Sequence, residues 1–83
     1  MHEEQISESL QKVYVLFEKG KIRPRALLWG TRRYEVVQIN SSWIDRSRRL
    51  PWHGFSLTVD SGEIFQVLYD GNASWKLEYI LTD

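Results

Sequence analysis

The stretch that decides the fold is FSLTVDSGEIFQVLYDGNASWKLEYIL, residues 55–81. Apolar and polar side chains alternate strictly over residues 55–60, which predicts a β-strand with one buried and one solvated face. Residues 61–62 (Ser-Gly) and 70–72 (Asp-Gly-Asn) are turn sequences, because glycine and asparagine adopt backbone conformations that most residues avoid. A second alternation begins at Trp75. The stretch therefore predicts three antiparallel strands joined by two turns.

The pairing of these strands determines which side chains share a face. We expect a two-residue turn at 61–62 and a four-residue turn at 71–74, and directly opposed residues then lie on the same side of the sheet. One face thereby gathers the apolar residues around a single polar residue, Gln66. The apolar residues are Phe55, Leu57, Val59, Ile64, Leu68, Trp75, Leu77, Tyr79 and Leu81.

A hairpin is predicted upstream, where residues 22–29 and 32–43 flank a Gly-Thr pair at 30–31. Glycine in the first central position suits a two-residue hairpin turn. Both faces of this hairpin are half apolar, which predicts that its second strand is long and bends. The opposed residues are Trp29 with Arg32 and Leu27 with Tyr34.

The chain is expected to form one small domain. Its 83 residues lie near the small end of what folds alone, and four Trp, four Tyr and three Phe supply the large side chains that a small core needs. We expect residues 1–11 to be a flexible N-terminal tail and residues 12–83 to be a single β domain. Regularly spaced turns predict an all-β antiparallel meander. We expect a strongly bent sheet or a partly open SH3-like or OB-like barrel of about five to six strands.

Composition and patterning exclude several classes of protein. There is no cysteine, so disulfide frameworks and thiolate metal sites are excluded. No run approaches the roughly 18 apolar residues of a membrane-spanning helix. The N-terminus is acidic, with Glu3, Glu4 and Glu8, unlike the basic start of a signal peptide. We therefore expect a cytoplasmic protein without membrane contact.

Charge is unevenly distributed although the net charge is zero. Residues 1–18 carry four acids and one base, residues 19–49 carry nine bases and two acids, and residues 50–83 carry five acids and one base. One interpretation is a basic face for an anionic partner. The alternative is that the acidic strands pair with the basic middle segment inside the folded sheet. A third interpretation is that four arginines make one sheet edge basic and so block its pairing with other chains. They are Arg23, Arg25, Arg32 and Arg33.

The loop at 45–54 is the first candidate binding site. It reads DRSRRLPWHG, and functional residues concentrate on long loops. Arginines suit bidentate contacts with phosphates, and aromatic rings beside them can stack on bases. The alternative is a solvated loop with Trp52 tucked beneath it. The candidate residues are Arg46, Arg48, Arg49, Trp52 and His53.

The strand at 63–70 offers a second candidate surface. Phe65, Val67 and Tyr69 share one of its faces, near Lys76 on the next strand. Aromatic side chains beside bases form platforms on which nucleobases stack. The alternative is that a closing barrel or the N-terminal strand covers this face, since a small core uses every aromatic residue it has. The candidate residues here are Phe65, Tyr69 and Lys76.

No catalytic or cofactor site is predicted. The two histidines, His2 and His53, are far apart in the chain, and neither has a partner at metal-binding spacing. The turn sequences at 61–62 and 70–72 are not phosphate-binding loops. We therefore expect neither catalytic residues nor a metal or other cofactor.

Several short motifs together resemble a known family. They are Leu28-Trp-Gly-Thr-Arg-Arg-Tyr-Glu-Val36, then Trp43, Phe65-x-x-x-Tyr69-Asp70 and Trp75-x-Leu-Glu-x-Ile80-x-x-Asp83. Over residues 12–83 the chain resembles a family of short uncharacterised bacterial proteins, a domain of unknown function whose members are sometimes encoded near Y-family DNA polymerases. Members often have a longer insertion near 45–54. The resemblance implies a role around DNA damage tolerance, and it carries over no catalytic residues.

We therefore expect a small non-catalytic binding module whose partner is nucleic acid or a protein of a DNA-processing or repair complex. The alternative is a protein–protein interaction module that docks through the 65–69 face or through an exposed edge strand. Phosphate contacts make affinity fall steeply with salt, whereas docking on an apolar face depends on salt only weakly.

Overall fold

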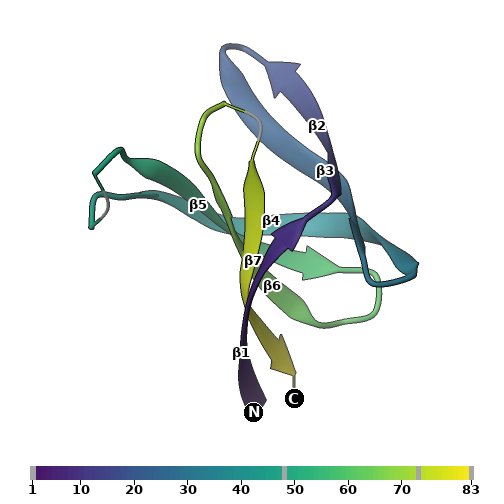
Figure 1. Ribbon diagram of the computed structural model, residues 1–83. Coiled ribbons are helices and arrows are strands. Elements are labelled where there is room, and N and C mark those ends of the chain that lie inside the picture. Colours follow the sequence, from purple (N-terminus) through teal and green to yellow (C-terminus); the bar gives the residue numbers. More distant parts are fainter. Residues whose placement is uncertain (1, 48, 73, 83) are drawn as a thin grey trace.

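The computed structural model describes residues 2–47, 49–72 and 74–82. These residues form one antiparallel sheet with the strand order β1-β7-β6-β5-β4-β3-β2, and the sheet is not closed (Figure 1). The all-β antiparallel fold is therefore confirmed, but the described residues form seven strands where five to six were expected. The strands are β1 (His2–Leu10), β2 (Lys12–Glu18), β3 (Lys21–Trp29), β4 (Arg32–Asp45), β5 (Trp52–Val59), β6 (Ile64–Tyr69) and β7 (Trp75–Thr82).

The N-terminal segment is a strand, so the expectation of a flexible tail over residues 1–11 is wrong. β1 pairs along β7, from His2 opposite Thr82 to Leu10 opposite Trp75. Leu10 belongs to the buried core, and Ile6 packs against it. The polar sequence of β1 concealed this role, because a strand with one solvated face needs only a few inward apolar residues.

The β3–β4 hairpin has the predicted register. Trp29 lies opposite Arg32, and Leu27 lies opposite Tyr34. Gly30 has a φ of 66°, in the left-handed region that the first central position of this turn requires. Only glycine adopts that conformation without steric cost, so the turn sequence fixes the pairing.

β4 is the long bent strand that the sequence predicts. Its first part pairs with β3, and its later part pairs with β5. Register shifts at Val37 and Asn40 each insert one unpaired residue into the β4–β5 ladder. Such bulges bend a strand and exchange its faces. Ile39 therefore packs against the core instead of sharing the outer face with Val37.

The turn after β5 is longer than expected, and the difference reverses a whole strand. The main-chain N–H of Gly62 donates to the carbonyl of Val59 at 2.9 Å, and the turn contains three residues, 60–62. Because side chains alternate along a strand, this one-residue change turns the opposite face of β6 inward. Phe65 and Val67 are consequently fully buried.

A register shift at Glu78 changes the faces of β7 in a similar way. Beyond the shift Ile80 enters the core, and Tyr79 and Leu81, which were expected there, are only half-buried. The alternating sequence gives no sign of this bulge, because both faces of the strand offer apolar residues. The predicted interior is therefore correct for the first half of β7 and wrong for the second.

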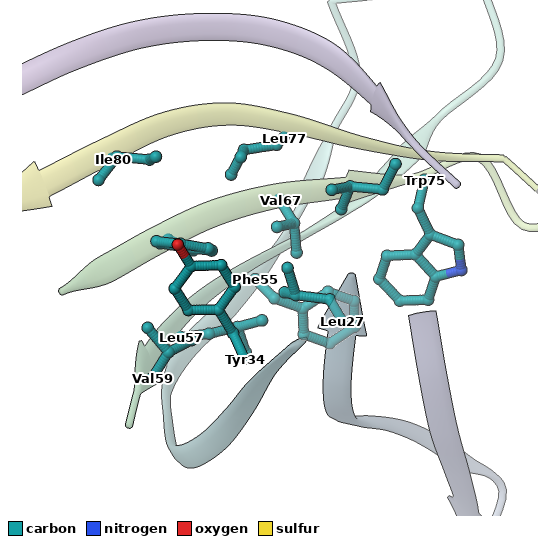
Figure 2. Packing of buried hydrophobic residues seen from close by; sticks show 11 residues of the cluster. Leu27, Tyr34, Phe55, Leu57, Val59, Val67, Trp75, Leu77 and Ile80 are labelled. Carbon is teal, nitrogen blue, oxygen red and sulfur yellow. The ribbon is translucent and has the colours of Figure 1, made fainter. Parts of the chain in front are cut away.

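The core contains two aromatic groups joined by aliphatic side chains (Figure 2). In one group the ring centroids of Phe65 and Tyr34 are 4.8 Å apart. In the other, Phe55 lies 5.9 Å from Trp75, which stacks on Tyr69 at 4.4 Å. Aromatic pairs of this kind add stability beyond the area that they bury. The aliphatic residues of the cluster are Leu10, Leu27, Leu57, Val59, Val67, Leu77 and Ile80.

Candidate nucleic-acid interface

Three chain connections share one end of the sheet. Neighbouring strands run in opposite directions, so the β2–β3 turn, the β4–β5 loop and the β6–β7 loop follow the same ends of their strands. In Figure 1 the bend of the sheet directs the β2–β3 turn and the β6–β7 loop upward and the β4–β5 loop to the left. The other end carries the β3–β4 turn, the β5–β6 turn and both chain ends. We call the first of these the groove end.

A groove of about 570 Å³ opens at the groove end. Its lining comes from residues 20–22 at the β2–β3 turn and from the paired strand segments 42–44 and 53–55. Lys21, from the β2–β3 turn, and His53, from β5, are among the lining residues. Volumes of this size are typical of sites for small molecules.

An aromatic row leads from the core to this groove. Cross-strand pairing places Ile44, His53, Tyr69 and Trp75 next to one another on four adjacent strands. The rings of Tyr69 and Trp75 are stacked, with 20° between their planes. Trp75 is buried, Tyr69 is half-buried and His53 is exposed. The aromatic part of the row therefore ends in the accessible ring of His53, which lines the groove beside the exposed Ile44.

The opposite face of the same strands carries a second row. It consists of Trp43, Gly54, Leu68 and Lys76. Glycine is needed at position 54, because a Cβ there would overlap the indole of Trp43. Leu68 is buried on this outer face, and Lys76 lies 3.9 Å from Glu78. The predicted Lys76 therefore lies on the other side of the sheet from His53.

Four basic side chains at the groove end lack acidic partners within the described part of the chain. Lys19 and Lys21 lie at the β2–β3 turn, and Arg46 and Arg49 lie in the β4–β5 loop. All four are exposed, and none of them makes an ion pair with a described residue. This end of the molecule thus keeps uncompensated positive charge.

The carboxylates of the two loops at this end are turned toward their own backbones. Asp45 Oδ1 accepts hydrogen bonds from the N–H of Ser47 at 2.9 Å and from its hydroxyl at 2.6 Å. Asp70 Oδ1 accepts from the N–H groups of Asn72 at 2.8 Å and Ser74 at 3.1 Å. Aspartate commonly fixes turns in this way, which makes the start of each loop a defined structure.

Other arginines pair within the sheet. These contacts join residues from the basic middle segment to acids on the same or neighbouring strands. Pairing of the basic middle segment with the acidic C-terminal segment was one interpretation of the charge pattern, and Arg32–Asp60 is a pair of that kind. The basic face for an anionic partner stays a prediction. The pairs are Arg23–Glu18 at 3.4 Å, Arg32–Asp60 at 3.5 Å and Arg33–Glu35 at 2.8 Å.

The structure brings together some of the predicted site residues. His53 and Tyr69 are directly paired, and Arg46 and Arg49 lie in the loop that leads into β5. Trp52 is half-buried opposite Asp45 and, one residue before His53, faces the other side of the sheet.

Phe65 is a predicted site residue that is not available for this surface. Phe65 is fully buried in the core, so it is not a platform for a base, and the prediction that it contacts a ligand is wrong. The prediction for Arg48 lies outside the described residues. The buried face of β6 agrees with the alternative that a small core uses its aromatic residues internally.

Lys21 and Trp43 line the groove but were missed as site residues by the sequence analysis. Trp43 lies opposite Gly54 in the β4–β5 ladder, one position from His53. Lys21 comes from the β2–β3 turn and meets these residues only through the bend of the sheet, which alternation does not reveal. One signal was present: a glycine inside a strand marks a close approach of another group, and Gly54 is covered by an indole.

Within residues 2–47, 49–72 and 74–82, no group of three or more His, Asp or Glu side chains could hold a metal ion. No helix in this part of the chain is long and apolar enough to cross a membrane. Comparisons with protein-family models, curated proteins and solved structures gave no match. The resemblance to the bacterial family accordingly stays a prediction.

Proposed function

We propose that the protein is a small non-catalytic binding module that holds a single nucleic-acid strand at the groove end. The observation that carries this proposal is the aromatic row, whose exposed end borders a groove flanked by unpaired basic side chains. Proteins that bind single strands combine aromatic stacking with a positively charged path for the backbone. Unstacked bases can enter such a hollow, whereas the bases of a duplex are already stacked and paired.

Each group in the site has a proposed role. His53 offers its ring to a base, and Tyr69 supports it from the adjacent strand. Lys21, Arg46 and Arg49 contact phosphates, and the arginines do so with forked donors that match phosphate oxygens. Stacking is tolerant of base identity, so we expect little sequence preference.

We also propose that the bent sheet is a partly open barrel of the SH3-like or OB-like kind. Two observations support this: β1 continues into β2 through the single residue Gln11, and β1 contacts β3 as well as β7. The two edge strands of the sheet are thereby held near each other. Barrels of the OB type bind nucleic-acid strands with their sheet face and adjoining loops.

A fluorescence-anisotropy titration with labelled single-stranded DNA and RNA of one sequence tests the function. We expect binding to both at low salt, with an affinity that falls as salt is raised, because phosphate contacts release counterions. Replacing Arg46 and Arg49 together by Ala should weaken binding and reduce the slope of log affinity against log salt by about 1.4, since each single-strand phosphate contact contributes about 0.7.

The matched control is Arg32→Ala. Arg32 is an exposed arginine at the other end of the sheet and is already paired with Asp60. Its loss should leave affinity and salt slope unchanged. Absence of binding at low salt, or an equal loss of affinity in this control, would contradict the proposal.

A place in DNA processing or repair, and a cytoplasmic location, remain proposals. The first rests on the family resemblance, and a preference for DNA over RNA in the same titration would support it. We do not propose that a protein docks on the 65–69 face, because Phe65 and Val67 are fully buried there. Docking at an edge strand has a separate structural argument, given next.

A further inference from the structure

β2 presents an unpaired edge with an exposed apolar sequence. It is the terminal strand of the sheet order, and no described strand lies along its far side (Figure 1). Residues 13–17 are all apolar or aromatic, between Lys12 and Glu18. Phe17 is 69% exposed and Leu16 is 44% exposed. An edge of this kind is a template for another strand.

β1, the other edge strand, is protected in ways that β2 is not. It carries Glu3, Glu4 and Glu8, which would repel an identical strand, and Ser7 has a φ of 52° at a register shift. Repeated charge and bulges are common means by which sheet edges avoid pairing. In the β2–β3 ladder the extra residue is Arg25 on β3, so β2 itself is continuous.

We propose that two copies of this chain pair through β2, antiparallel, about a twofold axis at Val15. β2 is complementary to itself in this register, because its ends carry opposite charges and its centre pairs aromatic with aliphatic residues. Both kinds of cross-strand pair stabilise antiparallel neighbours, and the twofold axis supplies each pair twice. The opposed residues, one from each copy, are Lys12 and Glu18, Val13 and Phe17, and Tyr14 and Leu16.

The same register suits the main-chain groups. Lys19 and Gly20 form a two-residue turn with φ values of 51° and 75°, and Glu18 and Lys21 close the hairpin. In such a hairpin the main-chain N–H and C=O groups of Glu18 point toward β3. Because these groups alternate in direction along a strand, those of the odd-numbered β2 residues point away from β3. In the twofold register odd-numbered residues oppose odd-numbered residues, so these outward groups meet each other.

Sedimentation equilibrium of the purified chain without nucleic acid tests the dimer. The wild type should rise from 9.9 kDa toward twice that mass as its concentration approaches the high micromolar range. Lys12→Glu alone should raise the dissociation constant roughly tenfold to a hundredfold, because two attractive pairs become repulsive. Glu18→Lys alone should raise it in the same direction, and it also removes the Glu18–Arg23 pair within each copy. The double variant restores opposite charges and should return to within a few-fold of the wild type.

A matched pair of variants tests the apolar contact. Phe17→Ser should weaken the dimer, whereas Leu50→Ser, which removes another exposed apolar side chain from the β4–β5 loop, should not. A wild type that stays monomeric at all concentrations, or a double variant that fails to recover, overturns the proposal. Because no nucleic acid is present, this outcome is independent of the function proposed for the groove end.

Discussion

The two ends of the sheet contain similar aromatic groups that differ in how far they are exposed. We call the end at the β3–β4 turn the closed end and the groove end the open end. At the β3–β4 turn, Phe65 is fully buried, with ring centroids 6.1 Å from Trp29 and 4.8 Å from Tyr34. Arg32 lies over the Tyr34 ring at 4.7 Å and is paired with Asp60. Phe65 and Tyr34 are buried there, Trp29 is half-buried, and the cation over Tyr34 has a carboxylate partner.

The aromatic group at the groove end is open. Phe55, Trp75 and Tyr69 continue outward to the exposed His53, and the cations nearby have no acidic partner in the described part of the chain. The comparison teaches that aromatic and basic residues do not by themselves mark a binding surface. A surface can bind a ligand where an aromatic ring is exposed and the nearby cation has no carboxylate partner.

The largest expected effect concerns the closed end. Phe65→Ala should lower the free energy of unfolding by about 3–5 kcal/mol, since it removes a fully buried aromatic side chain. Tyr69→Ala on the same strand should cost much less, because Tyr69 is half-buried. Urea unfolding of both variants checks this. If Ile64→Ala proved costlier than Phe65→Ala, the observed register of β6 would be wrong.

Gly54→Ala should cause the next largest loss of stability, because the added methyl group overlaps the indole of Trp43. Overpacking of this kind costs about 1–3 kcal/mol in unfolding free energy. Introducing the change in a Trp43→Ala background should cost little, since the overlap is gone. A double-mutant cycle measures this coupling, and additive effects would show that the indole does not lie on Gly54.

His53→Ala tests the open end directly. Loss of one stacking side chain should weaken single-strand binding by about tenfold, within the roughly 1–3 kcal/mol reported for stacking on aromatic residues. Stability should change by less than about 0.5 kcal/mol, because the side chain is exposed. His2→Ala, at the other end of the sheet, is the matched control. Equal affinities for the two variants would remove His53 from the site.

Arg32→Ala should have the smallest effect. The Arg32–Asp60 pair is solvent-exposed, so its loss should lower the unfolding free energy by less than about 1 kcal/mol. Thermal unfolding measures this change. A much larger loss would indicate that the cover over Tyr34 matters more to the closed end than its exposed ion pair suggests.

Local sequence rules predicted the strand register correctly where the turn sequence was compatible with only one turn length. Gly30 permits a single tight turn, and the β3–β4 register is as expected. The sequence at 60–63 is compatible with a two-residue or a three-residue turn, and Gly62 in the left-handed conformation selects the longer one. One residue of difference reversed β6, and with it the predicted exposure of Phe65.

Prediction of the site met a different limit. The loop composition singled out Arg46, Arg49 and His53 as candidates, because functional residues concentrate on long loops and these residue types suit phosphates and bases. The place of Lys21 in the groove depends on how the bent sheet brings the β2–β3 turn near β4 and β5. That arrangement is set by bulges and long-range pairing, which leave no periodic signal in the chain.

The pairing of β1 with β7 also affects how the molecule is made. His2 lies beside Thr82, so β1 precedes the other six described strands in the chain but pairs with β7, which follows all of them. Contacts between residues so distant in the chain slow folding, because a large loop must close before they form. Until then, β1 and the edge of β7 remain open to wrong partners, and the sheet is completed in a late step.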